Sequence, residues 1–232
     1  MNSQPQYHGH RFPPEVISYA VWLYHRFTLS FRDIEDLLAE RGIIVSYESI
    51  RQWCQKFGPD FAKRLRNKQG KLGDTWYADE IFIKINGELH YLWRAVDQDG
   101  DVLDILVQRR RDKRAALRFF RKLLKAQAST SRALVTDKLR SYGAARKELM
   151  RSVAHSRDRY ANNRAEASHQ HTRQHKRQMR RFKSHGQAQR VLSVHSQVHN
   201  LFHVGRHLYK SLPLSDVSGP RLSAWSAATC AC

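Results

Sequence analysis

Three carboxylates could act together in this chain: Asp79, Asp137 and Glu166. Asp79 interrupts an apolar row on a predicted strand, Asp137 ends a second short strand, and Glu166 lies on a predicted helix. A carboxylate in an apolar row is costly unless a cation, a metal or water reaches it. Such a trio can hold two divalent cations about 3.5–4 Å apart, the spacing used for in-line displacement at phosphorus. Oxygen ligands favour Mg²⁺, for which Mn²⁺ can substitute.

The chain that carries these acids is strongly basic. Its formal net charge is +20, and residues 129–211 carry 18 Lys and Arg against 4 Asp and Glu. A basic block of this size predicts a polyanionic partner, most often nucleic acid, whose affinity falls steeply with salt. An acidic pocket on a basic protein therefore predicts an enzyme that cuts or joins DNA. The alternatives are a solvated basic surface and a chance coincidence among the 21 acids of the chain.

Other acids have simpler explanations. We expect turn, strand-edge and helix-cap roles for Asp97, Asp99, Asp101, Asp104 and Asp112. The cysteines are Cys54, Cys230 and Cys232, whose spacing shows neither a disulfide framework nor a zinc finger. With no apolar run long enough for a membrane and no signal peptide at the start, the expected location is a reducing cytosol, on DNA.

Residues 10–60 predict an all-α domain. A helix over 13–27 begins with prolines, and Ser30 with Asp33 can form a capping box for a second helix through Arg41. Gly42 ends that helix, Ser46 can cap a third, and Gly58-Pro59 is expected to end the third.

This arrangement favours a DNA-binding helix-turn-helix, in which the last helix enters the major groove. Its outward side chains include Arg and Gln, which can pair with guanine and adenine edges. A plain three-helix bundle with a solvated face remains the alternative. The candidate DNA contacts on this helix are Arg51, Gln52, Gln55 and Lys56.

A period of two then replaces the helical period. After residues 61–73, a linker or a continuing basic helix, the runs 75–85, 90–97 and 101–107 predict an antiparallel meander with turns at Asn86-Gly87 and 97–100. Helices are expected over 112–128, 141–150, 162–181 and 187–209, with a short strand over 133–136. This order predicts a mixed α/β, ribonuclease H-like catalytic domain over 74–211. Residues 212–232, rich in Ser and Ala, predict a disordered tail.

Basic and histidine residues flank Glu166 and continue to the last helix. Cations there could contact DNA phosphates without reading sequence, or could be an ordinary exposed surface. The candidates are Lys138, His169, Arg173, Lys176, Arg177, Arg180, Arg181 and Lys183. A row of histidines every four residues favours packing or DNA-facing roles over a zinc site, since no Cys or acid joins it. This row is His195, His199, His203 and His207.

The amino-acid sequence around each carboxylate resembles that of the DDE transposases of bacterial insertion sequences, specifically the insertion sequence 6 family. The resemblance extends over roughly residues 10–210 and includes the helix-turn-helix segments 30–35 and 41–43. The matching motifs are Trp76-Tyr77-Ala78-Asp79-Glu80, Ile83-Lys84-Ile85-Asn86-Gly87, Tyr91-Leu92-Trp93-Arg94-Ala95-Val96-Asp97, Thr136-Asp137-Lys138 and Asn162-Asn163-Arg164-Ala165-Glu166-Ala167-Ser168-His169.

The resemblance implies that Asp79, Asp137 and Glu166 form a DDE triad holding two Mg²⁺ ions. It implies a transposase that nicks the element's terminal inverted repeats and joins the 3′ ends to target DNA by a replicative, cointegrate-forming route. A homodimer or larger assembly on DNA is expected, and no membrane partner. Strand alternation aims Glu80 away from the metals, so Glu80 is not placed in the triad. The alternatives are an inactive DNA-binding remnant or regulator, and a general nuclease.

Overall fold

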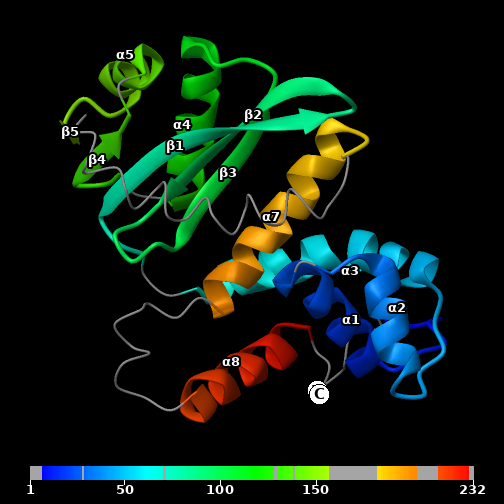
Figure 1. The fold of residues 1–232 in the computed structure, drawn as a ribbon. Coiled ribbons are helices and arrows are strands. Elements are labelled where there is room, and N and C mark those ends of the chain that lie inside the picture. The colour runs from blue at the N-terminus through cyan, green and yellow to red at the C-terminus, as the bar shows by residue number, and fades with distance from the viewer. Residues whose placement is uncertain are drawn as a thin grey trace. The chain divides into compact units, whose positions relative to one another are not determined.

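The computed structural model describes residues 7–27, 29–69, 72–127, 130–137, 139–156, 182–202 and 214–229, and the side chains of 214–218 are not described. The chain divides into two compact units. One consists of Met1–Gln69 with Gln197–Cys232, and the other of Gly70–Ser196. Figure 1 shows the elements of both units.

The first unit begins with the three helices expected from the sequence: α1 (Pro14–Arg26), α2 (Phe31–Ala39) and α3 (Tyr47–Lys68). The predicted capping box is present, because the Ser30 amide donates to Asp33 Oδ2 at 2.7 Å and the Asp33 amide donates to Ser30 Oγ at 3.1 Å. Gly42, after α2, has a φ of +74°, a conformation that glycine adopts without steric cost. These local signals determine where α2 begins and ends.

Helix α3 continues beyond Gly58-Pro59, where its end was predicted, and reaches Lys68. The predicted end is therefore wrong, and of the two interpretations of residues 61–73 the continuing helix holds as far as Lys68. Pro59 removes one backbone donor from the helix. Beyond Pro59, however, Phe61, Ala62 and Leu65 are buried on the face that Phe57 begins. Burial of this face compensates for the hydrogen bond that proline cannot make.

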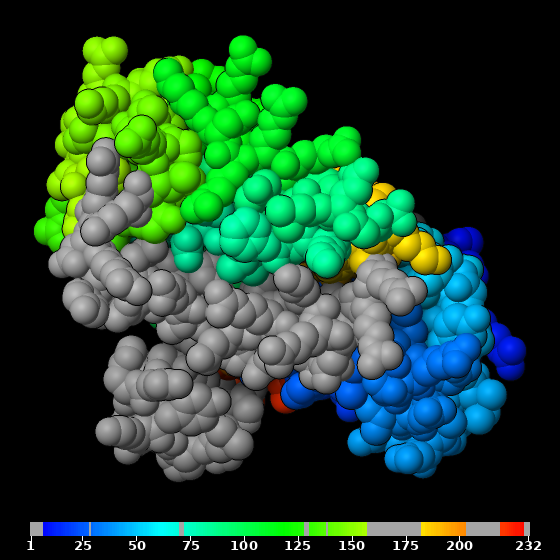
Figure 2. Space-filling view, turned by 45° about the horizontal axis from the view of Figure 1, so that its top comes forward, coloured from blue at the N-terminus to red at the C-terminus, as the bar shows by residue number. Residues whose placement is uncertain are grey.

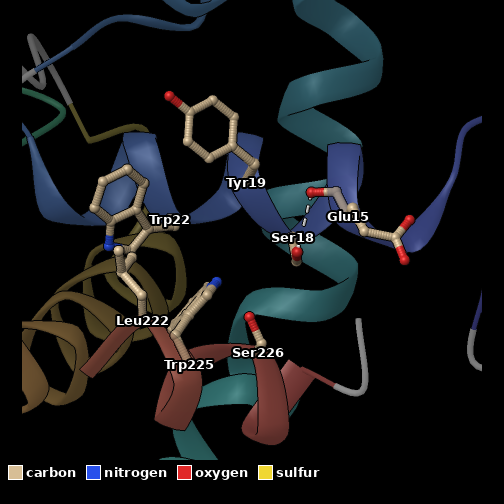
Figure 3. A pocket seen from close by; sticks show the side chains of 7 residues that line it. All are labelled: Glu15, Ser18, Tyr19, Trp22, Leu222, Trp225 and Ser226. Carbon is tan, nitrogen blue, oxygen red and sulfur yellow. Dashed lines mark hydrogen bonds between the residues drawn. The ribbon is translucent and has the colours of Figure 1, made fainter. Parts of the chain in front are cut away.

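Helix α8 (Leu214–Thr229) occupies the segment predicted to be a disordered tail, and that prediction is wrong. Trp225 is 4% exposed and its ring centroid lies 5.5 Å from that of Phe61. Tyr7 Oη donates to the Thr229 carbonyl at 2.8 Å. A composition dominated by small residues hid the few that anchor this helix. Figure 3 shows Trp225 and Leu222 of α8 facing Trp22 of α1 across an open pocket.

The second unit contains a five-stranded sheet in the order β3-β2-β1-β4-β5. The strands are β1 (Thr75–Ile85), β2 (Glu88–Val96), β3 (Val102–Gln108), β4 (Ala133–Thr136) and β5 (Ala154–Ser156). The first three form the predicted antiparallel meander, whereas β4 and β5 continue the sheet in parallel to β1. Asn86 and Gly87 have positive φ at the first hairpin turn, as their sequence predicts. The mixed sheet, with helices in the same unit, confirms the predicted mixed α/β class.

Each face of the sheet has its own apolar core. Helices α4 (Lys113–Gln127) and α5 (Arg140–Leu149) pack on the face that carries Trp76 and Trp93. Helix α7 (His185–Phe202) packs residues such as Leu192 on the opposite face. The alternation along β1 therefore decides which helix each of its side chains meets.

In the described part of the chain, no helix combines the length and apolar character needed to span a membrane.

We predict that Trp225→Ala destabilises the first unit by about 3–5 kcal/mol, because truncating a buried indole leaves a cavity. Thermal unfolding of the full chain, followed by tryptophan fluorescence and circular dichroism, measures the effect. Leu222→Ala is the control, since Leu222 lies on the same helix but is 45% exposed and should change stability by about 0.5 kcal/mol or less. Equal small effects of the two substitutions would show that α8 does not contribute to the core.

Candidate active site

The parallel pairing of β1 with β4 brings two of the three candidate carboxylates together. Ala78 lies opposite Thr136 in this register, so the next residues, Asp79 and Asp137, are neighbours. Asp137 follows the last residue of β4, where its side chain is released from the sheet. Carboxylate oxygens of Asp79, Glu80 and Asp137 all lie within 4.8 Å of one another. One strand pairing thus brings together two acids that lie nearly sixty residues apart in the sequence.

Both aspartates accept a backbone amide, and burial affects the pKa of Asp137. Asp79 Oδ1 accepts the Glu80 amide at 2.8 Å, and Asp137 Oδ1 accepts the Leu139 amide at 2.9 Å. Burial raises the pKa of Asp137, and the negative charge of Asp79 adds to the rise, while the Leu139 amide and Arg111 oppose it. The shift records the cost of holding like charges together in a partly desolvated site.

Glu80 is the residue that sequence reasoning left out. As alternation predicts, it lies on the face covered by α4 and α5, where its side chain is 2% exposed. Its Oε2 nevertheless accepts a 2.6 Å hydrogen bond from Tyr142 Oη, and its Oε1 forms an ion pair with Arg111 Nε. An oxygen of Glu80 thereby stays within reach of the aspartates. Alternation gave the correct face but not the direction of the carboxylate.

Burial raises the pKa of Glu80 to about 7, more than the Tyr142 hydrogen bond and Arg111 lower it. The charges of Asp137 and Asp79 raise it further. Glu80 is therefore a carboxyl group whose charge depends on its neighbours.

Arg111 is a second residue that no motif predicted. It follows β3, which runs parallel to β1 because both strands are antiparallel to β2. The carboxyl ends of β1, β3 and β4 therefore point the same way, and the segment after β3 can approach the carboxylates. Arg111 Nη2 lies 3.4 Å from Asp137 Oδ2 while its Nε contacts Glu80. Only the strand order could have identified Arg111 among Arg109, Arg110 and Arg111.

A buried arginine lies on the other face, opposite Asp79. Arg94 of β2 pairs directly with Asp79 in the antiparallel register, and its exposed fraction is 3%. Directly opposed residues of antiparallel strands share a face and have neighbouring Cβ atoms. Burial lowers the pKa of Arg94 to about 10, which leaves the guanidinium charged at neutral pH. The site therefore has positive side chains on both faces of β1.

Two of the acids expected in turn and cap positions, Asp97 and Asp112, accept backbone amides there, and Asp104 forms a buried ion pair instead. Asp97 Oδ1 accepts the amides of Asp99 and Asp101 in the second hairpin turn. Asp112 Oδ1 accepts the Ala115 amide at the start of α4. Asp104, 1% exposed, forms an ion pair with Lys122. Among the described residues, the carboxylate group consists of Asp79, Glu80 and Asp137, and none of these structural acids belongs to it.

On α3, the four candidate DNA contacts are not equivalent. Glu48 Oε2 accepts from Arg51 Nε at 2.7 Å, and Glu48 Oε1 accepts from Gln52 Nε2 at 3.1 Å. These hydrogen bonds lower the pKa of Glu48 to about 2. Gln55 and Lys56 are exposed, and Lys56 Nζ lies 2.8 Å from His10 Nε2. Glu48 therefore holds Arg51 and Gln52 in fixed directions.

Several predicted site residues lie outside the described residues. These are Lys138, Glu166, His169, Arg173, Lys176, Arg177, Arg180, Arg181, His203 and His207, together with the helix expected over 162–181. Lys183 is described and exposed, and its amide donates to Gln187 Oε1 at 2.8 Å. His195 and His199 are each 5% exposed, as a packing role requires.

The described carboxylates fit a divalent cation of the Mg²⁺ type. Asp79, Glu80 and Asp137 offer hard, negatively charged oxygens close together and no sulfur or nitrogen ligand. Asp79 Oδ1 and Asp137 Oδ1 accept backbone amides, and Asp137 Oδ2 lies 3.4 Å from Arg111 Nη2. Glu80 is less available, because Tyr142 and Arg111 take its two oxygens.

Comparison with known proteins agrees with this geometry. A family model described as "DDE domain" matches residues 73–204. The transposase for insertion sequence-like element IS431mec of Staphylococcus aureus strain Mu50 is 31% identical over 216 residues, which are 90% of this chain and 95% of that protein. The transposase for insertion sequence element IS257 in transposon Tn4003, also from Staphylococcus aureus, is 30% identical with the same coverage.

Likeness to solved structures is weaker. The HTLV-2 integrase catalytic core domain in complex with magnesium (trimeric form) has a TM-score of 0.37 and 14% identity, over 68% of this chain and 87% of that chain.

The family match and the paired aspartates define a DDE-type polynucleotidyl transferase. Within that class, the chain belongs to the insertion sequence 6 family of bacterial transposases.

We predict that the metal-free protein loses stability as pH rises from about 4.5 to about 7, in part through Glu80. In this window the folded chain keeps the Glu80 proton that the unfolded chain releases, so the free energy of unfolding falls as pH rises. Glu80→Gln cannot titrate, and its stability relative to the wild type should increase across the window and level off above it. Denaturant unfolding in EDTA measures this; parallel pH profiles would contradict the raised pKa.

Proposed function

We propose that this transposase binds the terminal inverted repeats of its element, nicks their 3′ ends and joins those ends to target DNA. The observation that carries the proposal is the adjacency of Asp79 and Asp137, whose carboxylates lie within 4.8 Å in a chain of net charge +20. Acidic side chains are rarely brought together unless a cation compensates them. The family match supports transposition as the reaction that these carboxylates serve.

In this proposal Asp79, Asp137 and Glu166 hold two Mg²⁺ ions, and Mn²⁺ can replace them. When bound, the ions supply activation of the attacking oxygen and stabilisation of the leaving 3′ oxygen. The backbone amides of Glu80 and Leu139 keep the two aspartates aimed at a common point. The route is replicative and produces cointegrates, and two element ends require a homodimer or larger assembly of this chain.

DNA recognition is divided between the two units in this proposal. Helix α3 reads the inverted repeat through exposed Gln55 and Lys56 and through Arg51 and Gln52, which Glu48 orients. The basic residues 129–211 bind phosphates without sequence preference. Among the candidates for this second role are Lys138, His169, Arg173, Lys176, Arg177, Arg180, Arg181 and Lys183.

Asp79→Asn should abolish nicking and strand joining but leave inverted-repeat binding intact, because it removes charge from the metal ligands and leaves α3 unchanged. A labelled duplex carrying the repeat that flanks the coding frame, incubated with Mg²⁺, reports both products on a denaturing gel. A mobility-shift assay in EDTA reports binding. The charge-matched control is Asp99→Asn, a turn residue away from the carboxylate group. Full activity of Asp79→Asn would refute the assignment, and a wild type that binds the repeat but cuts with neither Mg²⁺ nor Mn²⁺ would indicate an inactive remnant.

Gln55→Ala and Lys56→Ala should weaken DNA binding in different ways. Loss of a base contact at Gln55 costs about 1–3 kcal/mol of discrimination at one base pair, whereas loss of a phosphate contact at Lys56 weakens binding to all sequences alike. Competition titrations with the repeat, single-base variants of it and unrelated DNA separate the two. If Gln55→Ala bound every competitor in the same proportions as the wild type, α3 would not read that base.

A further inference from the structure

Arg111 is held at the carboxylate group by three contacts. Its Nε forms an ion pair with Glu80 Oε1, its Nη2 lies 3.4 Å from Asp137 Oδ2, and its Cζ lies 5.9 Å from the centroid of the Phe82 ring. The side chain is 33% exposed. Phe82, on the β1–β2 hairpin that is teal in Figure 2, is itself 50% exposed. The guanidinium is therefore fixed on one side and open to solvent on the other.

The two carboxylate contacts of Arg111 differ in strength. The Glu80 contact is buried, since that carboxylate is 2% exposed and its second oxygen is held by Tyr142 at 2.6 Å. The Asp137 contact is longer, and the Asp137 side chain is 35% exposed. Ion pairs in partly solvated positions contribute little and exchange readily. The Glu80 end is thus the anchor, and the Asp137 end is replaceable.

Arg111 also has N–H donors that its contacts with Glu80 and Asp137 do not use. A guanidinium presents five N–H groups in a planar fork that matches phosphate oxygens. Within the described part of the chain, Arg111 Nη1 has no hydrogen-bond partner. A cation with an anchored Nε, an Nη1 without a partner among the described residues and an Nη2 whose Asp137 contact is replaceable is suited to binding a phosphate in a defined place.

We propose that Arg111 is a phosphate-binding residue of the active site, which gives up Asp137 for a DNA phosphate when Asp137 binds a divalent ion. Glu80 is its positioning residue, not a member of the metal-binding triad. Without an ion, Arg111 offsets part of the repulsion among three carboxylates. With Asp137 engaged by an ion, Nη1 and Nη2 face the DNA that approaches the site. This inference rests on the proposed function, since it requires DNA at these carboxylates.

The salt dependence of DNA binding tests the proposal. Each phosphate contact that is lost reduces the slope of log affinity against log salt concentration by about 1. The probe is a duplex with an already cut repeat end and no target DNA, so that no joining occurs. With Mg²⁺ present, Arg111→Gln should show a slope about 1 unit smaller than the wild type. In EDTA, where Asp137 holds Arg111, the two slopes should agree.

Arg109→Gln is the matched control. Arg109 lies two residues away, and its ion pair is with Glu88 on the neighbouring strand, away from the aspartates. Its slope should equal that of the wild type in both conditions. Glu80→Gln should reproduce the Mg²⁺-dependent loss seen in Arg111→Gln, because the guanidinium loses its anchor. In the same variant the Mg²⁺ affinity measured by calorimetry should stay within about twofold of the wild type, a change of about 0.4 kcal/mol.

The outcomes separate the inference from the proposed function. Equal slopes for Arg111→Gln and the wild type in Mg²⁺ would overturn it, as would an equal loss in Mg²⁺ and EDTA, which would mean that no exchange occurs. A large loss of Mg²⁺ affinity in Glu80→Gln would instead make Glu80 a ligand. If Arg111→Gln does not fold, Arg111→Lys keeps the charge but not the fork, and retention of its slope with reduced joining supports the proposal. Failure of the wild type to cut DNA refutes the proposed function, whereas the slopes test Arg111 separately.

Discussion

The pairing of β1 with β4 places two negative charges side by side in a partly buried site, and much of the surrounding structure compensates for that repulsion. Burial raises the pKa of Asp137, and the negative charge of Asp79 adds to the rise. The compensation comes from backbone amides at Glu80 and Leu139 and from the guanidinium of Arg111. The sheet supplies the rigidity, because Asp79 lies within β1 and Asp137 directly follows β4, which pairs with β1.

A single strand serves both sides of this site. Because β1 alternates, Asp79 shares a face with Arg94 and with the core under α7, whereas Glu80 enters the core under α4 and α5. Adjacent acids therefore reach one point from opposite faces, with different surroundings. The two neighbouring acids therefore lie in different environments, Asp79 partly exposed and Glu80 enclosed beside Tyr142.

Elements with local causes were predictable from the sequence. The capping box at Ser30 and Asp33, the left-handed Gly42 and the Asn86-Gly87 turn are decided within a few residues, and each is present. Elements that depend on distant partners were not. Helix α3 passes through Pro59 because Phe61 and Leu65 are buried beyond it, and α8 forms because Trp225 meets Phe61. Composition and helix-breaking residues contain no information about such contacts.

The sequence by itself determined the mixed α/β class, the helical N-terminal region and the identity of Asp79 and Asp137 as candidates, because periodicity and motif wording are properties of short segments. The tertiary structure alone decided which other side chains reach those aspartates. Arg111 arrives from a different strand, and the Glu80 carboxylate is turned by Tyr142, so neither position follows from spacing along the chain. The physical reason is that ion pairs and buried hydrogen bonds depend on distance in space, which strand order and register establish only after folding.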